Sequence, residues 1–583
     1  MYAAALQGFE KQPVPGPSST PEAELDARLR RLRAEARAFA RLDPRVKARL
    51  LREVRARFYD LSPRMVELGC RAKGLEPDSP LEGEEWVSGP AISLRGLRLF
   101  AETLDAVAAV GAPRVEPSEV ELLPNGRTSV RMAPRGPYDR ALFAGWQCQA
   151  WLSERTFPAR VVESQASFYR KREPDGTVTV VLGAGNVASI SVLDVLHHSF
   201  GRGAVCLLKM SPVNAYLGPL FELAFEPLVT RGYLAFAYGG AEVGAYLCDH
   251  DLVDSVHITG SAETHDTIVW GPPGPEREQR KRESRPKITK PVTSELGNVS
   301  PVLVMPDRYS GRELEVMARH IAGMVVNNAS FNCNAAKMIV TPRGWAQRSE
   351  LLERLRKTLA ACPSRLAYYP GAHERHRALL TAAEGATVDR LGDDSGGKLP
   401  WTVVSDLDPA SDSALFRVEP FCSIVSEVQV GQADPLEFLA AATRFANQRL
   451  WGTLNAMLFV SGRLERDERI ARAVDDAIVE LRYGTVTVNL WPAAAYGLVN
   501  PPWGGHPSST LADVQSGIGW GHDALLLENV EKVVLRGPLV GFPEPLWFPN
   551  HRHAADLGRA LARIEAEPRP AKVLSAAWAA IRK

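Results

Sequence analysis

The sequence predicts a protein of several α/β domains, and three observations carry this prediction. The chain has 583 residues, too many for one hydrophobic core, which suggests roughly three or four folding units. Apolar residues make up 45% and charged residues 23%, the balance of an ordinary globular protein. Strand-like apolar runs alternate with segments of helical length over 182–259 and again over 302–489. We therefore expect two α/β units, the first with a parallel sheet.

The N-terminal third predicts a leader, helices and a hairpin. Residues 11–22 are rich in Pro and Ser, and 22–59 alternates Leu, Ala and Phe with Arg and Glu at helical spacing. Gly176 lies in a Pro/Asp/Gly turn, and the alternating run TVTVVLGAGN follows it. We predict a flexible leader over 1–22, amphipathic helices after it, and a hairpin over 161–180 that leads into a core strand.

The remaining elements follow from apolar runs and breakers. In the first α/β unit the predicted strands are VTVVLGA, AVCLLKM, YLAFAYG and SVHITG. Pro, Gly and dense charge predict an exposed loop over 270–290, with a Pro/Arg-rich insertion at 271–286. In the second unit the predicted strands are MIVT, TVVSDL, SIVSEVQV, NAMLFV and GTVTVNL. Beyond Pro538 the chain is rich in Pro, Trp and Phe, and 551–583 has a helical pattern.

The composition excludes several classes of function. The 69 basic and 68 acidic residues nearly cancel, so no global field would gather nucleic acid or an anionic membrane. The 7 cysteines are scattered, form no CxxC pair and have no clustered histidines, which argues against disulfides and a metal site. We found no export signal and no membrane-length apolar stretch. We expect a soluble, cytoplasmic protein that acts on a small molecule.

Two short segments suggest a chemical site. Cys333 lies in NNASFNCNAAK, where small and amide residues surround one thiol. A single cysteine is more often a small buried apolar residue than a nucleophile, but polar neighbours favour a reactive thiolate. Glu295 lies in SELGNVSP, at the end of a strand-like run. Glu-Leu-Gly followed within about forty residues by such a cysteine resembles the aldehyde dehydrogenase superfamily.

Further blocks resemble the motifs of that family, in the family's order, over roughly 168–538. They are GAGNVAS, CLLKMSP, DSVHITGSAE, VEPF, ANQRLWGT, GTVTVN, PWGG and SGIGWGHDALLLENVEKVVL. The resemblance implies an α/β fold with a Rossmann-type cofactor-binding domain, an α/β catalytic domain and a small oligomerisation hairpin. It implies Cys333 as nucleophile, Glu295 as the base that activates water, and Asn186 as a donor to the substrate oxygen. For the cofactor, NAD or NADP, it implies Lys209, Ser211, Gly260, Ser261, Glu419 and Phe421.

The resemblance also divides the chain. It assigns 1–160 and 181–296 to NAD(P) binding, 161–180 to the oligomerisation hairpin and 297–490 to the catalytic domain. Residues 491–537 return to the cofactor and oligomerisation region, and 538–583 form a C-terminal extension with no counterpart. An aldehyde is the implied substrate, and the resemblance implies a homodimer or homotetramer.

Three departures leave alternatives open. Gly185 precedes Asn186 where the family has a bulkier context, which predicts a wider substrate tunnel. Asn298 and Val299 replace Gly and Lys after Glu-Leu-Gly, a feature that also resembles acyl-CoA reductases of the superfamily. Pro212 stands where a carboxylate often binds the adenosine ribose, which leaves NADP open. The sequence thus predicts a hydrolytic aldehyde dehydrogenase, with a coenzyme A-dependent enzyme and an inactive scaffold as alternatives.

Overall fold

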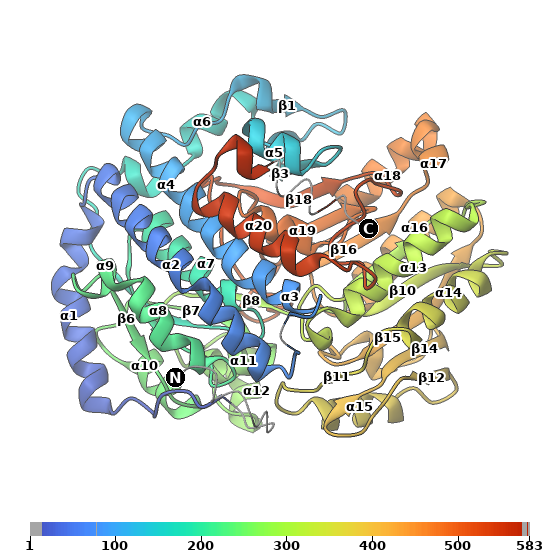
Figure 1. Ribbon diagram of the computed structural model, residues 1–583, viewed down its shortest axis with the longest axis horizontal. Helices are drawn as coiled ribbons and strands as arrows, with labels where there is room; N and C mark the ends of the chain where they lie inside the picture. Colours follow the sequence, from blue (N-terminus) through green and yellow to red (C-terminus); the bar gives the residue numbers. More distant parts are fainter. Residues whose placement is uncertain (1–13, 77, 155, 574–579, 581–583) are drawn as a thin grey trace.

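Two large β-sheets organise the structure, a computed structural model that describes residues 14–573, except 77 and 155, together with residue 580 (Figure 1). The first sheet is parallel throughout and has the order β6-β5-β4-β7-β8. Its strands are β4 (Val178–Leu182), β5 (Val205–Lys209), β6 (Leu234–Ala237), β7 (Ser255–Gly260) and β8 (Val292–Leu296). This confirms the predicted parallel α/β unit, whose apolar strands are buried on both faces.

The second sheet has eleven strands in the order β1-β2-β3-β18-β17-β16-β9-β10-β15-β14-β12. Its central strands are β9 (Pro301–Val304), β10 (Met338–Arg343), β14 (Trp401–Leu407), β15 (Ile424–Gln432), β16 (Asn455–Phe459), β17 (Thr485–Val488) and β18 (Val530–Arg536). β12 (Thr387–Leu391) closes one edge, and β11 (Arg365–Leu366) pairs separately with β13 (Lys398–Leu399). The five strands predicted in this region are confirmed as β10, β14, β15, β16 and β17.

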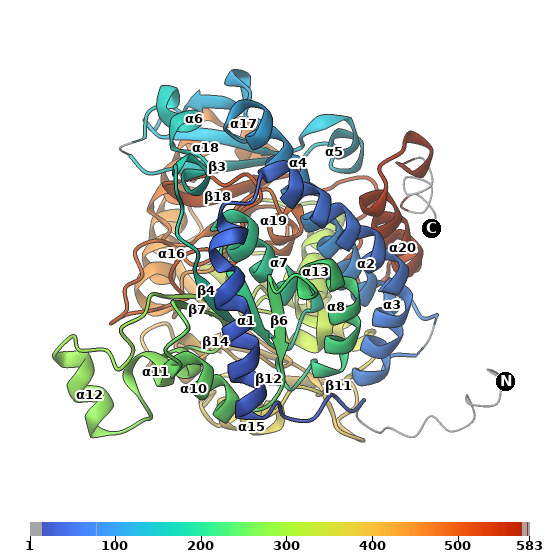
Figure 2. The ribbon, with the colours of Figure 1, turned by 90° about the vertical axis from the view of Figure 1, so that its left-hand side faces the viewer.

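Helices cover both sheets, as Figures 1 and 2 show. Around the five-stranded sheet lie α1 (Glu22–Ala40), α2 (Pro44–Ala72), α4 (Ile92–Val110), α7 (Ala188–Leu196), α8 (Gly218–Ala224), α9 (Glu226–Val229), α10 (Ala241–Asp249) and α11 (Ala262–Trp270). With the second sheet lie α13 (Gly311–Val326), α14 (Arg348–Ala360), α15 (Ala372–Thr381), α16 (Pro435–Arg449), α17 (Gly462–Arg466), α18 (Glu468–Glu480) and α19 (Ala493–Leu498). The amphipathic helices predicted over 22–59 are confirmed as α1 and the first part of α2.

Residues 120–152 belong to a different sheet from the one assigned. β1 (Val120–Leu122), β2 (Thr128–Ala133) and β3 (Gln147–Leu152) lie in the eleven-stranded sheet, because β3 pairs antiparallel with β18. The assignment of all of 1–160 to cofactor binding is therefore wrong for this part. The pairing joins strands almost 400 residues apart in the chain, which no local pattern reveals.

The hairpin predicted over 161–180 is also absent. This segment holds α6 (Val161–Ser164), the 3₁₀ turn η5 (Ser167–Arg170) and the first residues of β4. Alternation after Gly176 marks β4 correctly, but β4 pairs with β5 and β7 instead of folding back on its neighbour. Antiparallel pairing of adjacent strands occurs instead in β1, β2 and β3.

Three terminal or inserted segments also differ in part from the expectation. The insertion at 271–286 is an exposed helix, α12 (Pro275–Arg282), rather than a loop (Figure 2). Of the predicted leader, 1–13 lie outside the described residues, whereas Thr20 is buried and its N–H donates to the Tyr238 oxygen at 3.0 Å. In the C-terminal extension, α20 (Ala554–Ala566) confirms a helix within 551–583.

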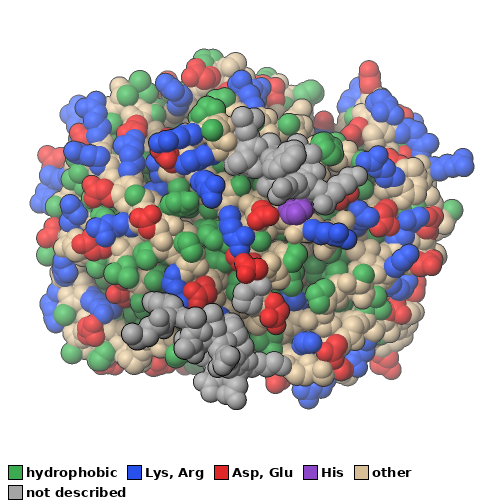
Figure 3. All heavy atoms as spheres, in the orientation of Figure 1, with side chains coloured by type: hydrophobic (Ala, Val, Ile, Leu, Met, Phe, Trp, Pro, Cys, Tyr) green, Lys and Arg blue, Asp and Glu red, His purple; other side chains and the backbone are tan. Residues whose placement is uncertain are grey.

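The surface carries mixed charge, consistent with the near-zero net charge. On the face shown in Figure 3, Lys and Arg side chains are interspersed with Asp and Glu, and hydrophobic side chains lie between them. Among the described residues, none of the helices combines the length and the apolar character that crossing a membrane requires.

Candidate active site

Cys333 follows a turn whose backbone is strained. Asn328, Ala329 and Ser330 have φ angles of 52°, 53° and 69°, a region that L residues rarely adopt and that often marks a functional site. The Asn328 amide supports the turn by donating to the backbone oxygens of Asn186 at 3.0 Å and Phe331 at 3.1 Å. Cys333 is partly exposed, whereas the other six cysteines are buried. The turn therefore presents the one accessible thiol of the chain.

The surroundings of the Cys333 thiol favour its protonated form. Burial raises the pKa of Cys333 well above its usual value, and the charges of Glu295 and Glu419 raise it further, while Lys337 acts in the opposite direction. A thiolate is the reactive form of cysteine. For this thiol to act as a nucleophile, a neighbouring base would have to take its proton.

Glu295 is the nearest candidate for that group. It lies at the end of β8 and its residue is 3% exposed. Burial, and then the charge of Asp194, raise the pKa of Glu295 to about 8, although Cys333 and Trp503 partly offset the shift. Its Oε1 has no hydrogen-bond partner among the described residues. A carboxyl with a pKa near neutrality and a free oxygen is suited to moving protons.

Asn186 lies in the turn before α7 and is also buried. Its Nδ2 donates to the Phe331 oxygen at 2.9 Å, which uses one of the two amide hydrogens. Its backbone oxygen accepts hydrogen bonds from Lys73 Nζ at 3.2 Å and from the Asn328 amide at 3.0 Å. Asn186 is thus fixed to the turn that carries the thiol.

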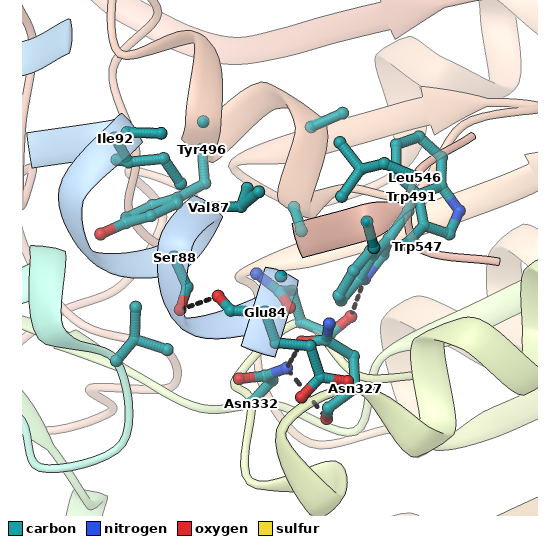
Figure 4. Close-up of a pocket in the computed structure, with 18 of the residues that line it drawn as sticks. Glu84, Val87, Ser88, Ile92, Asn327, Asn332, Trp491, Tyr496, Leu546 and Trp547 are labelled. Atoms are coloured by element: carbon teal, nitrogen blue, oxygen red, sulfur yellow. Dashed lines mark hydrogen bonds between the residues drawn. The ribbon is translucent and has the colours of Figure 1, made fainter. Parts of the chain in front are cut away.

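Cys333, Asn186 and Glu295 line both of two adjoining cavities. The first, which we call the apolar cavity, has a volume of about 230 Å³ and is bounded by Val87, Ile92, Trp491, Tyr496 and Trp547 among others (Figure 4). The second, which we call the cleft, has a volume of about 1060 Å³ and lies along the carboxyl ends of β4, β5, β7 and β8. The thiol therefore stands where the two spaces meet.

The cleft contains all six residues predicted to bind the cofactor. Lys209 ends β5, with Ser211 just after it, and Gly260 ends β7. Ser261 is the N-cap of α11, and its Oγ accepts from the Thr264 N–H at 3.1 Å. Carboxyl ends of parallel strands next to a helix N-terminus form the usual place for a dinucleotide and its phosphates.

Glu419 and Phe421 line the cleft from the segment that precedes β15. Lys337, fully buried, places its Nζ 3.4 Å from Glu419 Oε1. Burial raises the pKa of Glu419, whereas Lys337 lowers it. A Cβ at Gly297 would lie 1.8 Å from Glu419 Oε2, so only glycine leaves room for the carboxylate there. The ammonium of Lys209, the carboxylate of Glu419 and the backbone N–H groups of α11 suit the hydroxyl and phosphate groups of NAD or NADP.

The structure shows where the residues that depart from the family's pattern lie. Gly185 lines the cleft and not the apolar cavity, and a Cβ there would lie 2.5 Å from Ser211 Oγ. The wider substrate tunnel predicted from Gly185 is therefore wrong, because that residue faces the cofactor side. Asn298 is buried and donates from Nδ2 to the Asn455 oxygen at 2.9 Å, which stabilises the chain after Glu295. Pro212 lines the cleft as expected.

Sequence reasoning missed several polar residues around Glu295 and Glu419. Asp194, 2% exposed, accepts a hydrogen bond from Thr259 Oγ1 at 3.0 Å and lies 3.4 Å from His257 Nε2. As the one charged residue in the apolar run ISVLDVL it was detectable as an anomaly. Lys337 belongs to the quoted NNASFNCNAAK segment but was not assigned a role. Among the described residues no His, Cys, Asp or Glu cluster could hold a metal ion.

Comparisons with known proteins point to one family. The sequence model of the aldehyde dehydrogenase family matches residues 140–526, more than half of the chain. A 4-trimethylaminobutyraldehyde dehydrogenase of Bos taurus is 30% identical over 35% of this chain and 38% of its own length. A peroxisomal aminoaldehyde dehydrogenase 1 of Pisum sativum is 22% identical over 58% of this chain and 63% of its own. The chain thus matches less than two thirds of the length of these relatives.

Solved structures show the same fold. An aldehyde dehydrogenase of Mycobacterium tuberculosis complexed with NAD+ superposes with a TM-score of 0.59 at 18% identity, covering 90% of this chain and 92% of the other. An NADP-dependent glyceraldehyde-3-phosphate dehydrogenase of Bacillus halodurans, complexed with NADP, gives 0.58 at 15% identity, covering 89% and 92%. With the family match, the two sheets and the shared cavity wall, these likenesses establish that the chain is a divergent member of the aldehyde dehydrogenase family.

Proposed function

We propose that this protein oxidises an aldehyde to a carboxylic acid, with NAD or NADP as hydride acceptor, through a thioester on Cys333. One observation carries the proposal: Cys333 lines the wall common to the apolar cavity and the cleft, together with Asn186 and Glu295. An aldehyde in the apolar cavity and a nicotinamide in the cleft would then meet at the same sulfur atom.

The first step forms the carbon–sulfur bond. The ionised Glu295 carboxylate takes the thiol proton, and the Cys333 sulfur attacks the carbonyl carbon. The carbonyl oxygen becomes negatively charged in the resulting thiohemiacetal. The Asn186 amide and the Cys333 backbone N–H are the donors assigned to that oxygen, and each such donor typically contributes a few kcal/mol.

The second step removes a hydride from the thiohemiacetal, and the third hydrolyses the thioester on Cys333. An oxidised dinucleotide bound in the cleft would accept the hydride from the thiohemiacetal carbon, which would leave an acyl thioester on Cys333. Glu295 first releases the thiol proton to solvent. It then takes a proton from water, and the water oxygen adds to the acyl carbon. The carbon–sulfur bond breaks to release the acid, and the sulfur recovers a proton from Glu295. Lys209, Ser211, Gly260, Ser261, Glu419 and Phe421 hold the dinucleotide in this assignment.

The test separates the two catalytic roles. Formation of NADH or NADPH is followed on the millisecond scale in wild type, Cys333→Ala and Glu295→Gln, with Cys148→Ala as a control for loss of a buried thiol. We expect Cys333→Ala to abolish the reaction and Cys148→Ala to retain it. Glu295→Gln is expected to form at most one equivalent of reduced cofactor per site, more slowly than wild type because the thiol proton has lost its acceptor, and then to stop. Full steady turnover by Cys333→Ala would refute the proposal.

The same assay decides between the alternatives. Addition of coenzyme A leaves the rate unchanged if water is the acceptor. A strict requirement for coenzyme A would reject the hydrolytic mechanism and support the acylating enzyme. Failure of both dinucleotides to bind in calorimetry would favour an inactive scaffold. A homodimer or homotetramer and a cytoplasmic location stay predictions, and light scattering tests the first.

A further inference from the structure

Two segments from opposite parts of the chain close the apolar cavity. One comprises 80–95, with α3 (Glu82–Trp86), the π-helical turn η2 (Val87–Ala91) and the start of α4; the other lies in 546–565, after β18. Both are outside the residues 140–526 that match the family. We propose that the C-terminal extension is the specificity wall of this site and selects uncharged aldehydes that carry an aromatic ring. The inference rests on the proposed function, which makes Cys333 the attacking group.

The extension is held tightly where it reaches the cavity. A Cβ at Gly323 on α13 would lie 2.3 Å from the Trp547 backbone oxygen, so the chain can pass there only because the residue is glycine. Trp547 Nε1 donates to His320 Nδ1 at 3.2 Å. The His320 ring also packs edge-on against Phe548, with ring centroids 4.8 Å apart. These contacts fix the wall in place, as a selective site requires.

The helix of the extension is docked as firmly. A Cβ at Gly83 on α3 would lie 2.4 Å from the Ala554 carbonyl carbon, at the start of α20. Glu565, near the end of α20, accepts from Arg95 at 2.9 Å and from Arg98 at 2.7 Å, and all three are largely buried. In Figure 1, α20 lies across the front of the molecule between its two halves.

Aromatic rings surround the space in front of the extension. Trp547 packs against Trp491 and Trp146 with ring centroids 6.0 and 6.3 Å apart, and Trp146 packs against Phe143 at 5.1 Å. The Trp491 Nε1 donates to the Asn334 oxygen at 2.7 Å, which fixes its ring beside the thiol segment. Figure 4 shows Trp491, Leu546 and Trp547 on one side of the cavity, opposite Val87, Ile92 and Tyr496. Such rings bind another ring in edge-to-face or offset contacts.

Charge decides between an aromatic and a cationic substrate, since aromatic cavities can also bind quaternary ammonium groups. Three carboxyl groups line the cavity. Glu295 lies at the thiol end, beside Cys333. The other two are already paired, Glu84 with Arg365 at 3.2 Å and Glu565 with arginines of α4. The Arg95 guanidinium lies 5.4 Å from the centre of the Phe143 ring, so one aromatic face already has a cation. A charged tail would lose its water without gaining a counterion.

Volume limits the size of the ligand. The cavity of about 230 Å³ is smaller than the roughly 300–1,000 Å³ of sites for drug-sized molecules. It suits a single ring on a short linker, such as 3-phenylpropanal, with the aldehyde at the thiol end.

The first experiment varies the charge of the substrate at constant shape. Wild-type kcat/KM is measured for 4-trimethylaminobutyraldehyde, which gives its name to relatives of this chain, and for its neutral isostere 5,5-dimethylhexanal. Because the cationic tail, which lies away from the thiol end, finds no unpaired carboxylate there, we expect the neutral aldehyde to react at least tenfold better and 3-phenylpropanal to be better still. Equal or preferred use of the cation would overturn the inference.

The second experiment tests the wall. Trp547→Ala should lower the ratio of kcat/KM for 3-phenylpropanal over propanal by about tenfold or more, because the ring contact is lost. Phe542→Ala is the matched control, since Phe542 lies in the same extension but is 77% exposed and outside the cavity; it should leave the ratio unchanged. If Trp547→Ala left the ratio of the two kcat/KM values unchanged, the assignment of Trp547 to the specificity wall would be contradicted.

A binding measurement separates failure of this inference from failure of the proposed function. Calorimetry with Cys333→Ala detects 3-phenylpropanal without reaction, and the double variant Cys333→Ala/Trp547→Ala should bind it at least tenfold more weakly. If wild type oxidises no aldehyde but this binding difference appears, the function is wrong and the ligand class stands. If Cys333→Ala binds no 3-phenylpropanal, the ligand class is wrong even in an active enzyme.

Discussion

The rate of thioester hydrolysis should follow the ionisation of Glu295. Its pKa of about 8 makes the ionised fraction about 9% at pH 7 and about 1% at pH 6. Only the ionised form can take a proton from water. Turnover should therefore rise about tenfold from pH 6 to 7, about fivefold from 7 to 8, and less than twofold above that.

A substitution at Asp194 tests this dependence by changing the pKa of Glu295. Its charge is the second largest cause of the raised pKa of Glu295, after burial, so Asp194→Asn should lower that pKa. A fall of one unit would raise the ionised fraction at pH 7 to about 50%, a gain of about fivefold in the hydrolytic rate. Asparagine can still accept the hydrogen bond from Thr259.

The assay is the steady rate that follows the burst, measured from pH 6 to 9.5 in wild type and variant. Asp523→Asn is the matched control, because Asp523 is buried to the same extent, 2% exposed, but is not among the main causes of the raised pKa of Glu295. The midpoint should move to lower pH in Asp194→Asn alone. Identical profiles for the three proteins, in a range where hydrolysis limits turnover, would refute the assignment of Glu295 or of its neighbour.

Two other groups give predictions of their own. Lys47 is fully buried among aromatic rings, and burial lowers its pKa from 10.5 to about 7. Between pH 10.5 and 7 the unfolded state therefore binds a proton at Lys47 that the folded state does not bind. The free energy of unfolding decreases as the pH falls through that window, by at most roughly 5 kcal/mol. Lys47→Met should thus raise the unfolding temperature at pH 7 and change it little near pH 10.5; a lower midpoint at pH 7 would contradict this. Without cofactor, Glu419→Gln should speed the alkylation of Cys333 by iodoacetamide at pH 8 severalfold, because the Glu419 charge raises the pKa of the thiol. Mass spectrometry of the Cys333 peptide measures the alkylation rate. An unchanged rate would show that Glu419 exerts no such effect.

The fold class was accessible from the sequence because its signals are local, and the catalytic candidates because their motifs resemble those of the aldehyde dehydrogenase family. A strand, the turn after it and the next helix occupy a few tens of residues, so TVTVVLGAGN, CLLKM and SVHITGSAE predicted the strands and the cleft residues at their ends. The roles of Cys333, Asn186 and Glu295 rest on the resemblance to the aldehyde dehydrogenase family. The parallel sheet by itself brings together only Asn186, after β4, and Glu295, in β8.

Tertiary structure alone decided the contacts between distant segments. β3 joins β18, Asp194 approaches Glu295, and Trp547 closes the apolar cavity, yet no period or motif connects these partners. Their positions depend on packing against whole sheets and helices, where a glycine such as Gly323 makes room for another backbone. The false hairpin at 161–180 has the same cause, because alternation reports burial and not the strand that pairs with it.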